Sequence, residues 1–330
     1  MKAPSFWAHK GLISTLLLPL SWLYQLAGLC RLGITRPYRS SLPVICVGNI
    51  TSGGTGKTPV SAYLAALARA QGLRPAILSR GYGGGLQEPT LIDPALHSAA
   101  DCGDEPLLLA MNTPVIVARH RGKGAAFIEA QNRFDLIIMD DGMQNPQLHK
   151  DHIICVFDGA VGMQNKRIFP AGPLRTKPAA GQKHASLIMV NGPDKTGLQA
   201  HITGTPIINF DLEAGASIPE IDTSQPLFAF AGIGRPDRFF ETLAQEGYYL
   251  VQTKAFGDHH PYQPDEITAL VEGARALSAL LITTEKDWVR LPKNCQDHIA
   301  YLPVSLHISE ADTARLTDIL NLTNPGKRAL

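Results

Sequence analysis

Short apolar runs alternate with helix-like stretches from residue 43 onward. The runs are rich in aliphatic and β-branched side chains, and they lie at residues 44–47, 76–78, 115–117, 136–139, 153–157 and 187–190. Apolar strands that lack an alternating polar face, and that helices separate, are typical of a parallel sheet covered on both faces. The pattern therefore predicts an α/β fold with helices on both faces of a parallel sheet.

A second, shorter alternation lies toward the carboxyl terminus. Apolar runs at 227–230, 249–251 and 280–283 flank a helix-like stretch near 239–245. The extended residues 207–210, the turn-like Gly215 and the following Pro219 precede it and predict a hairpin-like linker. A length of 330 residues also favours two domains. We predict a core domain at 41–204, a linker at 205–225 and a smaller α/β domain at 226–330.

Residues 11–30 form a run of twenty uncharged residues. The run could cross a bilayer core of about 30 Å, but Pro19 interrupts it. Three polar residues share one helical stripe and leave a broad apolar face opposite: Ser14, Ser21 and Gln25. We expect residues 1–40 to contain a helix that lies in the membrane surface, with a transmembrane span and a buried core helix as alternatives.

Charge is unevenly distributed, although the net charge is only +1. No acidic residue precedes Glu88, so residues 1–87 carry a charge of +9 and the remainder carries −8. This asymmetry favours an anionic membrane surface or an anionic substrate near the amino-terminal part. It predicts neither a nucleic acid nor a protein partner. Five scattered cysteines without a C-x-x-C pair exclude a disulfide framework and favour a cytosolic protein with reduced thiols.

A glycine-rich loop follows the first apolar run and precedes a helix-like stretch. Residues 51–58 are candidates for binding nucleotide phosphates: Thr51, Ser52, Gly53, Gly54, Thr55, Gly56, Lys57 and Thr58. Lys57 can reach the β- and γ-phosphates, and the Thr58 hydroxyl can complete a Mg²⁺ shell. A strict P-loop has Gly at position 51, so a turn that merely caps a helix remains an alternative. The context favours an NTP-binding, P-loop NTPase-like fold.

Three sets of polar residues could carry chemistry. Asp140 and Asp141 follow the run 136–139, where phosphate-loop proteins hold Mg²⁺, although a solvated turn would also contain them. Asp104 and Glu105 precede a Leu-rich helix, and their position alone favours helix capping. The loop 258–260 contains two histidines, which are weak evidence for a metal without a third ligand but could pair with a carboxylate base.

Seven short motifs occur in order along the chain. They are Gly48-Asn-Ile-Thr-Ser-Gly-Gly-Thr-Gly-Lys-Thr-Pro59, Leu78-Ser-Arg-Gly-Tyr82, Gly103-Asp-Glu-Pro106, Asp140-Asp-Gly-Met-Gln144, Phe169-Pro-Ala-Gly-Pro-Leu-Arg175, Asp258-His-His260 and Thr284-Glu-Lys-Asp287. Together they resemble the tetraacyldisaccharide 4′-kinase family, the membrane-associated lipid A kinases of Gram-negative bacteria. The resemblance extends from the apolar amino-terminal run to at least Leu291.

This resemblance implies transfer of the ATP γ-phosphate, with Mg²⁺, to the 4′-hydroxyl of a tetraacylated glucosamine disaccharide 1-phosphate. The product would be a lipid A precursor, lipid IVA, made at the cytoplasmic face of the inner membrane. By this likeness Asp104, paired with His259, is the base, which reverses the capping interpretation. Lys57 and Thr58 serve the phosphates and Mg²⁺, and Arg121 lies near the reacting phosphates or the acceptor. The expected metal ligands are Thr58, Asp140 or Asp141, and Glu105.

Two positions depart from the family pattern. Asn145 replaces a usual His, and Thr176 replaces a usual Glu, so the resemblance implies no substrate contact for those two side chains. Two other functions stay open: a membrane-anchored ATPase switch and a soluble kinase of a small metabolite. The first would hydrolyse ATP without a lipid acceptor, and the second would not need residues 1–40.

Overall fold

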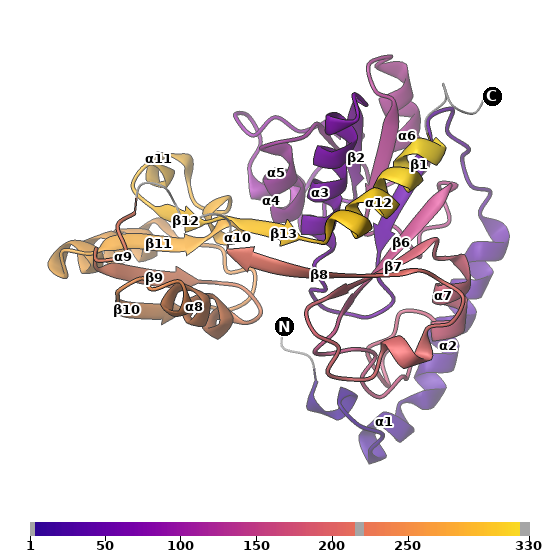
Figure 1. Cartoon of the computed structure of the whole chain (residues 1–330), viewed down its shortest axis with the longest axis horizontal. Coiled ribbons are helices and arrows are strands. Elements are labelled where there is room, and N and C mark those ends of the chain that lie inside the picture. The colour runs from indigo at the N-terminus through magenta and orange to yellow at the C-terminus, as the bar shows by residue number, and fades with distance from the viewer. Residues whose placement is uncertain (1–3, 215–220, 324–330) are drawn as a thin grey trace.

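The computed structural model describes residues 4–214 and 221–323, which form two lobes built on separate sheets (Figure 1). In the described residues, the larger sheet has the order β13-β8-β7-β6-β1-β5-β2-β4-β3 and the smaller has the order β10-β9-β11-β12. The strands are β1 Val44–Gly48, β2 Pro75–Ser79, β3 Thr90–Leu91, β4 Val115–Val117, β5 Leu136–Asp140, β6 His152–Asp158, β7 Leu187–Asn191, β8 Ile207–Ala214, β9 Leu227–Ala231, β10 Leu250–Ala255, β11 Leu280–Thr284, β12 Ala300–Leu302 and β13 Val304–His307.

Helices cover both faces of the larger sheet, as the sequence predicted. The helices are η1 Ser5–Trp7, α1 Leu12–Leu16, α2 Leu18–Ile34, α3 Lys57–Ala70, α4 Ala99–Cys102, α5 Asp104–Ala110, α6 Arg121–Ala130, α7 Pro178–His184, η2 Gln199–His201, α8 Pro236–Gln245, α9 Pro264–Ala276, α10 Glu285–Trp288, α11 Lys293–Gln296 and α12 Glu310–Thr323. One core cluster joins α3, α5 and α12 to the sheet, and another joins α6 to the opposite face.

The central strand β1 is buried along its whole length because helices pack on both of its faces. In α3, Val60, Leu64 and Ala68 recur every four residues and are fully buried against the sheet. Strand β1 pairs in parallel with β5, with Val47 opposite Asp140. This register brings the loop after β1 and the acids after β5 to the same edge of the sheet.

The expected boundaries of the linker and the smaller domain are wrong in two places. Residues 207–214 form β8, which pairs in parallel with β7 and extends the larger sheet instead of forming a hairpin linker. Strand β13 pairs antiparallel with β8, and α12 packs Leu316 and Leu320 into the core of the larger lobe. The chain therefore returns to the larger lobe after β12 (Figure 1). Gly215 and Pro219 lie outside the described residues.

Helices α1 and α2 attach to the larger lobe through polar side chains. Ser14 Oγ donates to Ala171 O at 2.6 Å, and Ser21 Oγ donates to Ile168 O at 2.8 Å. Both serines are buried. The side of the helices that faces the protein is thus the stripe of polar residues.

The apolar side chains of α1 and α2 face outward. Large exposed residues on these helices are Leu12, Ile13, Leu16, Leu20, Trp22, Leu23, Tyr24, Leu26, Leu29, Leu32 and Ile34. The buried core helix considered from the sequence is therefore wrong. In the part of the chain that the structure describes, no helix is both long enough and apolar enough to cross a membrane.

Candidate active site

The loop between β1 and α3 depends on a glycine at its last position. Gly56 caps the amino end of α3 with φ of 95°, in the left-handed region. A Cβ on Gly56 would lie 3.3 Å from both Asn191 Nδ2 and Phe210 Cζ. A Cβ on Gly53 or Gly54 would meet no atom within 4 Å. The loop therefore leaves room beside its middle glycines, at the amino end of a helix, where a phosphate group fits.

Two threonines of this loop are buried. Thr51 and Thr55 are each 4% exposed. Thr51 pairs with Leu174 in an isolated bridge, and the neighbouring Ser52 N donates to Pro173 O at 2.8 Å. Thr51, where a strict P-loop has glycine, thus fixes the loop to the segment 173–174.

Lys57 and Asp141 face each other across the sheet edge. Lys57 Nζ lies 3.9 Å from Asp141 Oδ1, and Arg175 Nη1 donates to the same oxygen at 2.9 Å. Burial raises the pKa of Asp141, but the charges of Lys57 and Arg175 outweigh burial and the net pKa is lowered. Asp141 is therefore held ionised beside the loop.

Asp140 has the opposite electrostatic environment. It ends β5, is 2% exposed and accepts a hydrogen bond from Ser61 Oγ at 2.8 Å. Burial raises its pKa, and the negative charges of Glu105 and Asp141 raise it further. The three carboxylates thus concentrate negative charge at this edge, and a cation there would relieve it.

The donors at this edge fit Mg²⁺. In residues 4–214 and 221–323, no group of three or more His, Cys, Asp or Glu side chains is arranged to hold a metal. Mg²⁺ is commonly held by one or two carboxylates together with water and substrate phosphates. The Asp140 carboxylate and the partly exposed Thr58 in the first turn of α3 have oxygen atoms that could serve as such ligands.

Asp104 uses its two carboxylate oxygens differently. Its Oδ1 accepts from Glu105 N at 3.0 Å, a local bond at the start of α5. Its Oδ2 accepts from His259 Nδ1 at 2.9 Å and from Arg290 Nη2 at 2.6 Å. Burial raises the pKa of Asp104, but Lys286, Arg290 and His259 lower it by more. Asp104 is therefore the first residue of a helix and also a buried carboxylate that joins the two lobes.

The two adjacent histidines have different partners. His259, with φ of 57°, contacts Asp104, and its Nε2 lies 3.9 Å from Asp258 Oδ1. His260 Nε2 lies 2.9 Å from Glu266 Oε2. The pair is thus divided between the candidate site and a helix cap.

Three charged residues at the site were not singled out as site residues from the sequence. They are Arg175, Lys286 and Arg290. Lys286 Nζ lies 3.1 Å from Glu105 Oε1 and 3.7 Å from Asp104 Oδ2. In the sequence, these residues were marked only by their position within or next to the motifs at 169–175 and 284–287.

Arg121 starts α6 and is almost fully buried. Its Nη1 donates to Ala118 O at 2.7 Å, whereas its Nε has no hydrogen-bond partner. Burial lowers its pKa to about 10, opposed by the charge of Asp140. A buried guanidinium with an unused donor near the carboxylates can attract an anionic group.

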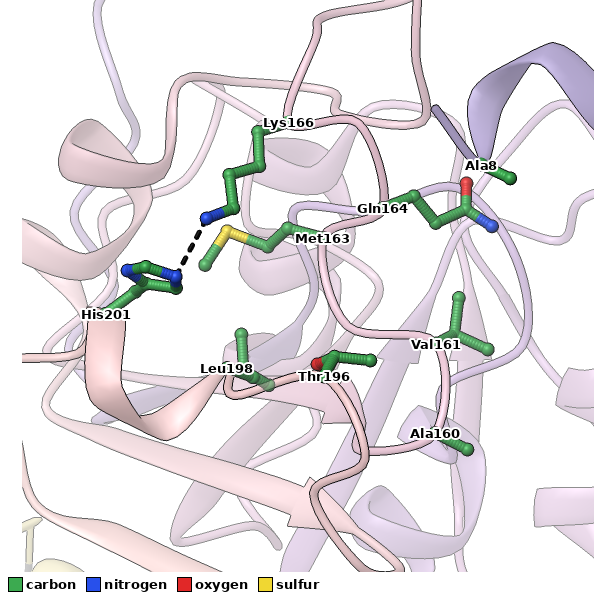
Figure 2. Close-up of a pocket in the computed structure, with 9 residues that line it drawn as sticks. All are labelled: Ala8, Ala160, Val161, Met163, Gln164, Lys166, Thr196, Leu198 and His201. Carbon is green, nitrogen blue, oxygen red and sulfur yellow. Dashed lines mark hydrogen bonds between the residues drawn. The ribbon is translucent and has the colours of Figure 1, made fainter. Parts of the chain in front are cut away.

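A separate cavity of about 420 Å³ lies beside the amino-terminal η1. Its lining residues are Ala8, Ala160, Val161, Met163, Gln164, Lys166, Thr196, Leu198 and His201 (Figure 2). Lys166 Nζ and His201 Nε2 are 2.8 Å apart on one side of it. No residue predicted for the active site lines this cavity.

The sequence that forms this site matches known proteins. A family model described as tetraacyldisaccharide-1-P 4′-kinase (LpxK) matches residues 13–322. This chain belongs to the LpxK family. The family predicted from the seven motifs is therefore confirmed.

Similar LpxK proteins cover almost the whole chain. A tetraacyldisaccharide 4′-kinase of Methylobacterium nodulans is 47% identical over 98% of this chain and 97% of its own length. One from Rhodospirillum centenum is 42% identical over 95% of this chain and 94% of its own. The crystal structure of Aquifex aeolicus LpxK in complex with ATP is 25% identical, with a TM-score of 0.76 over 94% of this chain and 99% of that one. The predicted P-loop kinase fold is thus confirmed.

Within this LpxK chain, the two departures from the family pattern lie beside the loops just described. Asn145 Oδ1 accepts from Gln147 N at 2.8 Å, and Gln147 Oε1 accepts from Arg121 N at 3.0 Å. Asn145 therefore supports the start of α6 within the protein. Thr176 follows Arg175 and is partly exposed.

Proposed function

We propose that this chain is an ATP-dependent lipid kinase. It transfers the γ-phosphate of ATP to the 4′-hydroxyl of a tetraacyl glucosamine disaccharide 1-phosphate, which gives the lipid A precursor of lipopolysaccharide biosynthesis. The family match and the names of its relatives support the acceptor, and the ATP complex of the Aquifex relative supports the nucleotide.

One observation supports the proposed chemistry of this site. Helix α3, which begins at Lys57 at the end of the phosphate loop, packs against α5, which begins at the candidate base Asp104, in one core cluster on the same face of the sheet. A hydroxyl acceptor placed there would lie between a carboxylate and the triphosphate. Phosphoryl transfer needs this positioning and charge neutralisation more than covalent catalysis.

Residues 51–58 would hold the triphosphate, with backbone N–H groups and Lys57 facing its oxygens. Thr58 and Asp140 would hold Mg²⁺, with Asp141 and Glu105 as the further candidate ligands. When bound, Mg²⁺ would neutralise charge that develops on the phosphate oxygens. Arg121 would add positive charge from beneath the site.

Asp104 would accept the proton of the 4′-hydroxyl. As the new P–O bond forms, the bond between the γ-phosphorus and the β–γ bridging oxygen breaks, and ADP leaves. His259 would orient the carboxylate and stabilise its charge through the 2.9 Å contact.

Helices α1 and α2 would hold the enzyme on the membrane. Their exposed apolar side chains suit the lipid boundary, and the basic residues 10, 31, 36 and 39 suit an anionic leaflet. We place the enzyme at the cytoplasmic face of the inner membrane, where ATP and the lipid acceptor meet.

Acceptor dependence of ATP turnover tests this function. We expect ADP release from purified enzyme with Mg²⁺ to require the disaccharide lipid. Equal ADP release with and without the lipid would favour an ATPase switch. Turnover of a small sugar alcohol in place of the lipid, unaffected by removal of residues 1–40, would favour a soluble metabolite kinase.

A further inference from the structure

Arg290 connects the smaller lobe to the candidate base. Its side chain is 7% exposed, and Nε and Nη2 donate to Asp104 Oδ2 at 3.1 and 2.6 Å. Two donors of one planar group on one oxygen fix both the position and the direction of the carboxylate.

The guanidinium is itself held in place. Arg290 Nη1 donates to Asp287 Oδ1 at 2.8 Å and to Gly232 O at 3.0 Å. Asp287 is fully buried and also accepts from Tyr262 OH at 2.9 Å, Thr284 Oγ1 at 2.6 Å and Gly232 N at 3.0 Å. The buried Asp287 therefore orients Arg290, and this gives the motif at 284–287 a physical role.

This arrangement leaves one Asp104 oxygen for chemistry. Oδ2 is occupied by Arg290 and His259, and Lys286 Nζ lies 3.7 Å from it. In the part of the chain that the structure describes, Oδ1 accepts one hydrogen bond, from the adjacent Glu105 N at 3.0 Å. A carboxylate oxygen can accept a second hydrogen bond, so Oδ1 can receive one from an acceptor hydroxyl.

We propose that Arg290 is a positioning residue for phosphoryl transfer, which holds Asp104 Oδ2 so that Oδ1 faces the acceptor hydroxyl. This inference rests on the proposed kinase function. It assigns Arg290 no contact with substrate or nucleotide. The effect of Arg290 on the reaction therefore passes through Asp104.

The chain offers a matched control for a purely structural role. Arg235, also from the smaller lobe, donates from Nη2 to the buried Asp158 Oδ2 of the larger lobe at 3.0 Å. It thus joins the two lobes through a guanidinium–carboxylate pair without contacting Asp104. A loss of activity caused by loosened lobes should follow from either arginine.

The test compares transfer kinetics of Arg290→Ala, Arg290→Lys and Arg235→Ala in the full chain, each checked for folding by its thermal midpoint. For Arg290→Ala we expect kcat to fall about 100-fold, with the KM values for ATP and lipid changed less than about threefold. Arg290→Lys keeps one charged donor, so its loss should be about tenfold. Added guanidinium ion should restore part of the Arg290→Ala activity and none in Arg235→Ala.

A double variant checks that Arg290 acts through Asp104. Asp104→Asn with Arg290→Ala should be within about twofold of Asp104→Asn alone, because residues that act as a unit are non-additive. Equal losses in Arg290→Ala and Arg235→Ala without guanidinium rescue would overturn the inference, as would additive losses in the double variant. If Arg290→Ala does not fold, an Arg290→Lys variant with wild-type kcat would overturn it. Absence of transfer by the wild-type enzyme would instead reject the kinase function.

Discussion

Asp104 and His259 lie 155 positions apart in the chain, yet their side chains meet at 2.9 Å. A residue that accepts the hydroxyl proton should affect the chemical step more than substrate binding. We predict that Asp104→Asn lowers kcat about 10²- to 10⁴-fold with a small change in KM. His259→Ala should cost less, about tenfold, because Arg290 still holds the carboxylate. Steady-state kinetics with both substrates varied would check this. A comparable change in KM and kcat for Asp104→Asn would argue for a binding role.

At the residue scale, the sequence predicted those site residues that belong to a recognisable short motif. The loop 51–58 and the acids at 140–141 follow apolar strands, so strand and motif together placed them at one sheet edge. The partners Arg175 and Arg290 could not be predicted in the same way. Each lies in or near a short motif without periodicity, and its acidic partner belongs to another part of the chain. Position alone also favoured capping for Asp104, because its second contact crosses between lobes.

At the element scale, α1 and α2 combine a polar contact face with an exposed apolar face. Leu16 and Leu23 are 70% and 62% exposed. We predict that changing both to Gln weakens binding to anionic vesicles about tenfold or more, because a buried leucine contributes on the order of 2 kcal/mol. The thermal midpoint should stay unchanged, since neither side chain supports the core. Vesicle sedimentation would measure this. Undiminished binding would show that these leucines do not contact the lipid.

The segment that follows α2 is tied to α6 by Glu129. Its Oε1 accepts from Ser40 Oγ at 2.7 Å and Ser41 Oγ at 2.9 Å, and its Oε2 accepts from Tyr38 OH. Burial raises the pKa of Glu129, but these hydrogen bonds lower it by more.

A lowered pKa gives this link a definite pH dependence. The ionised Glu129 contributes stability above its unfolded pKa of about 4.3, and this contribution is lost as the pH falls through and below that value. The free energy of unfolding should fall between pH 6 and pH 3. We predict that this fall is about 1 kcal/mol smaller in Glu129→Gln than in the wild-type protein. Urea unfolding at both pH values would measure it, with the exposed Glu88→Gln as control. An unchanged difference would mean that Glu129 titrates alike in the folded and unfolded states.

Periodicity predicted the strands of the larger sheet but not how far the sheet extends. The runs at 44–47 and 136–139 became β1 and β5 because a fully buried strand needs an apolar run. Strand β8 pairs with β13 through residues as distant along the chain as Asp211 and His307, and β13 lies at the edge of the sheet. An edge strand carries little apolar signal, so the sequence assigned β13 to the smaller domain and left β8 as a linker.

At the scale of the whole molecule, the candidate active site is divided between the lobes. The larger lobe supplies the phosphate loop, the acids and Asp104, and the smaller lobe supplies His259, Lys286 and Arg290. Strands β8 and β13 extend from one lobe toward the other (Figure 1), and contacts such as these join the described parts of the two lobes. We propose that neither lobe alone can carry out the transfer. The amino-terminal helices lie beside the larger lobe, which also contains the phosphate loop. The lipid and the nucleotide would therefore both bind on the side of the larger lobe.

The most direct test of this account is transfer of labelled phosphate. Purified full-length enzyme is incubated with γ-labelled ATP, Mg²⁺ and the tetraacyl disaccharide 1-phosphate, and the lipid is extracted. We predict label on the 4′-position of the lipid, and a loss of about 10³-fold in Lys57→Met, which removes the charge that faces the phosphates. Unlabelled lipid from folded wild-type enzyme, with label released only as inorganic phosphate, would contradict the assignment.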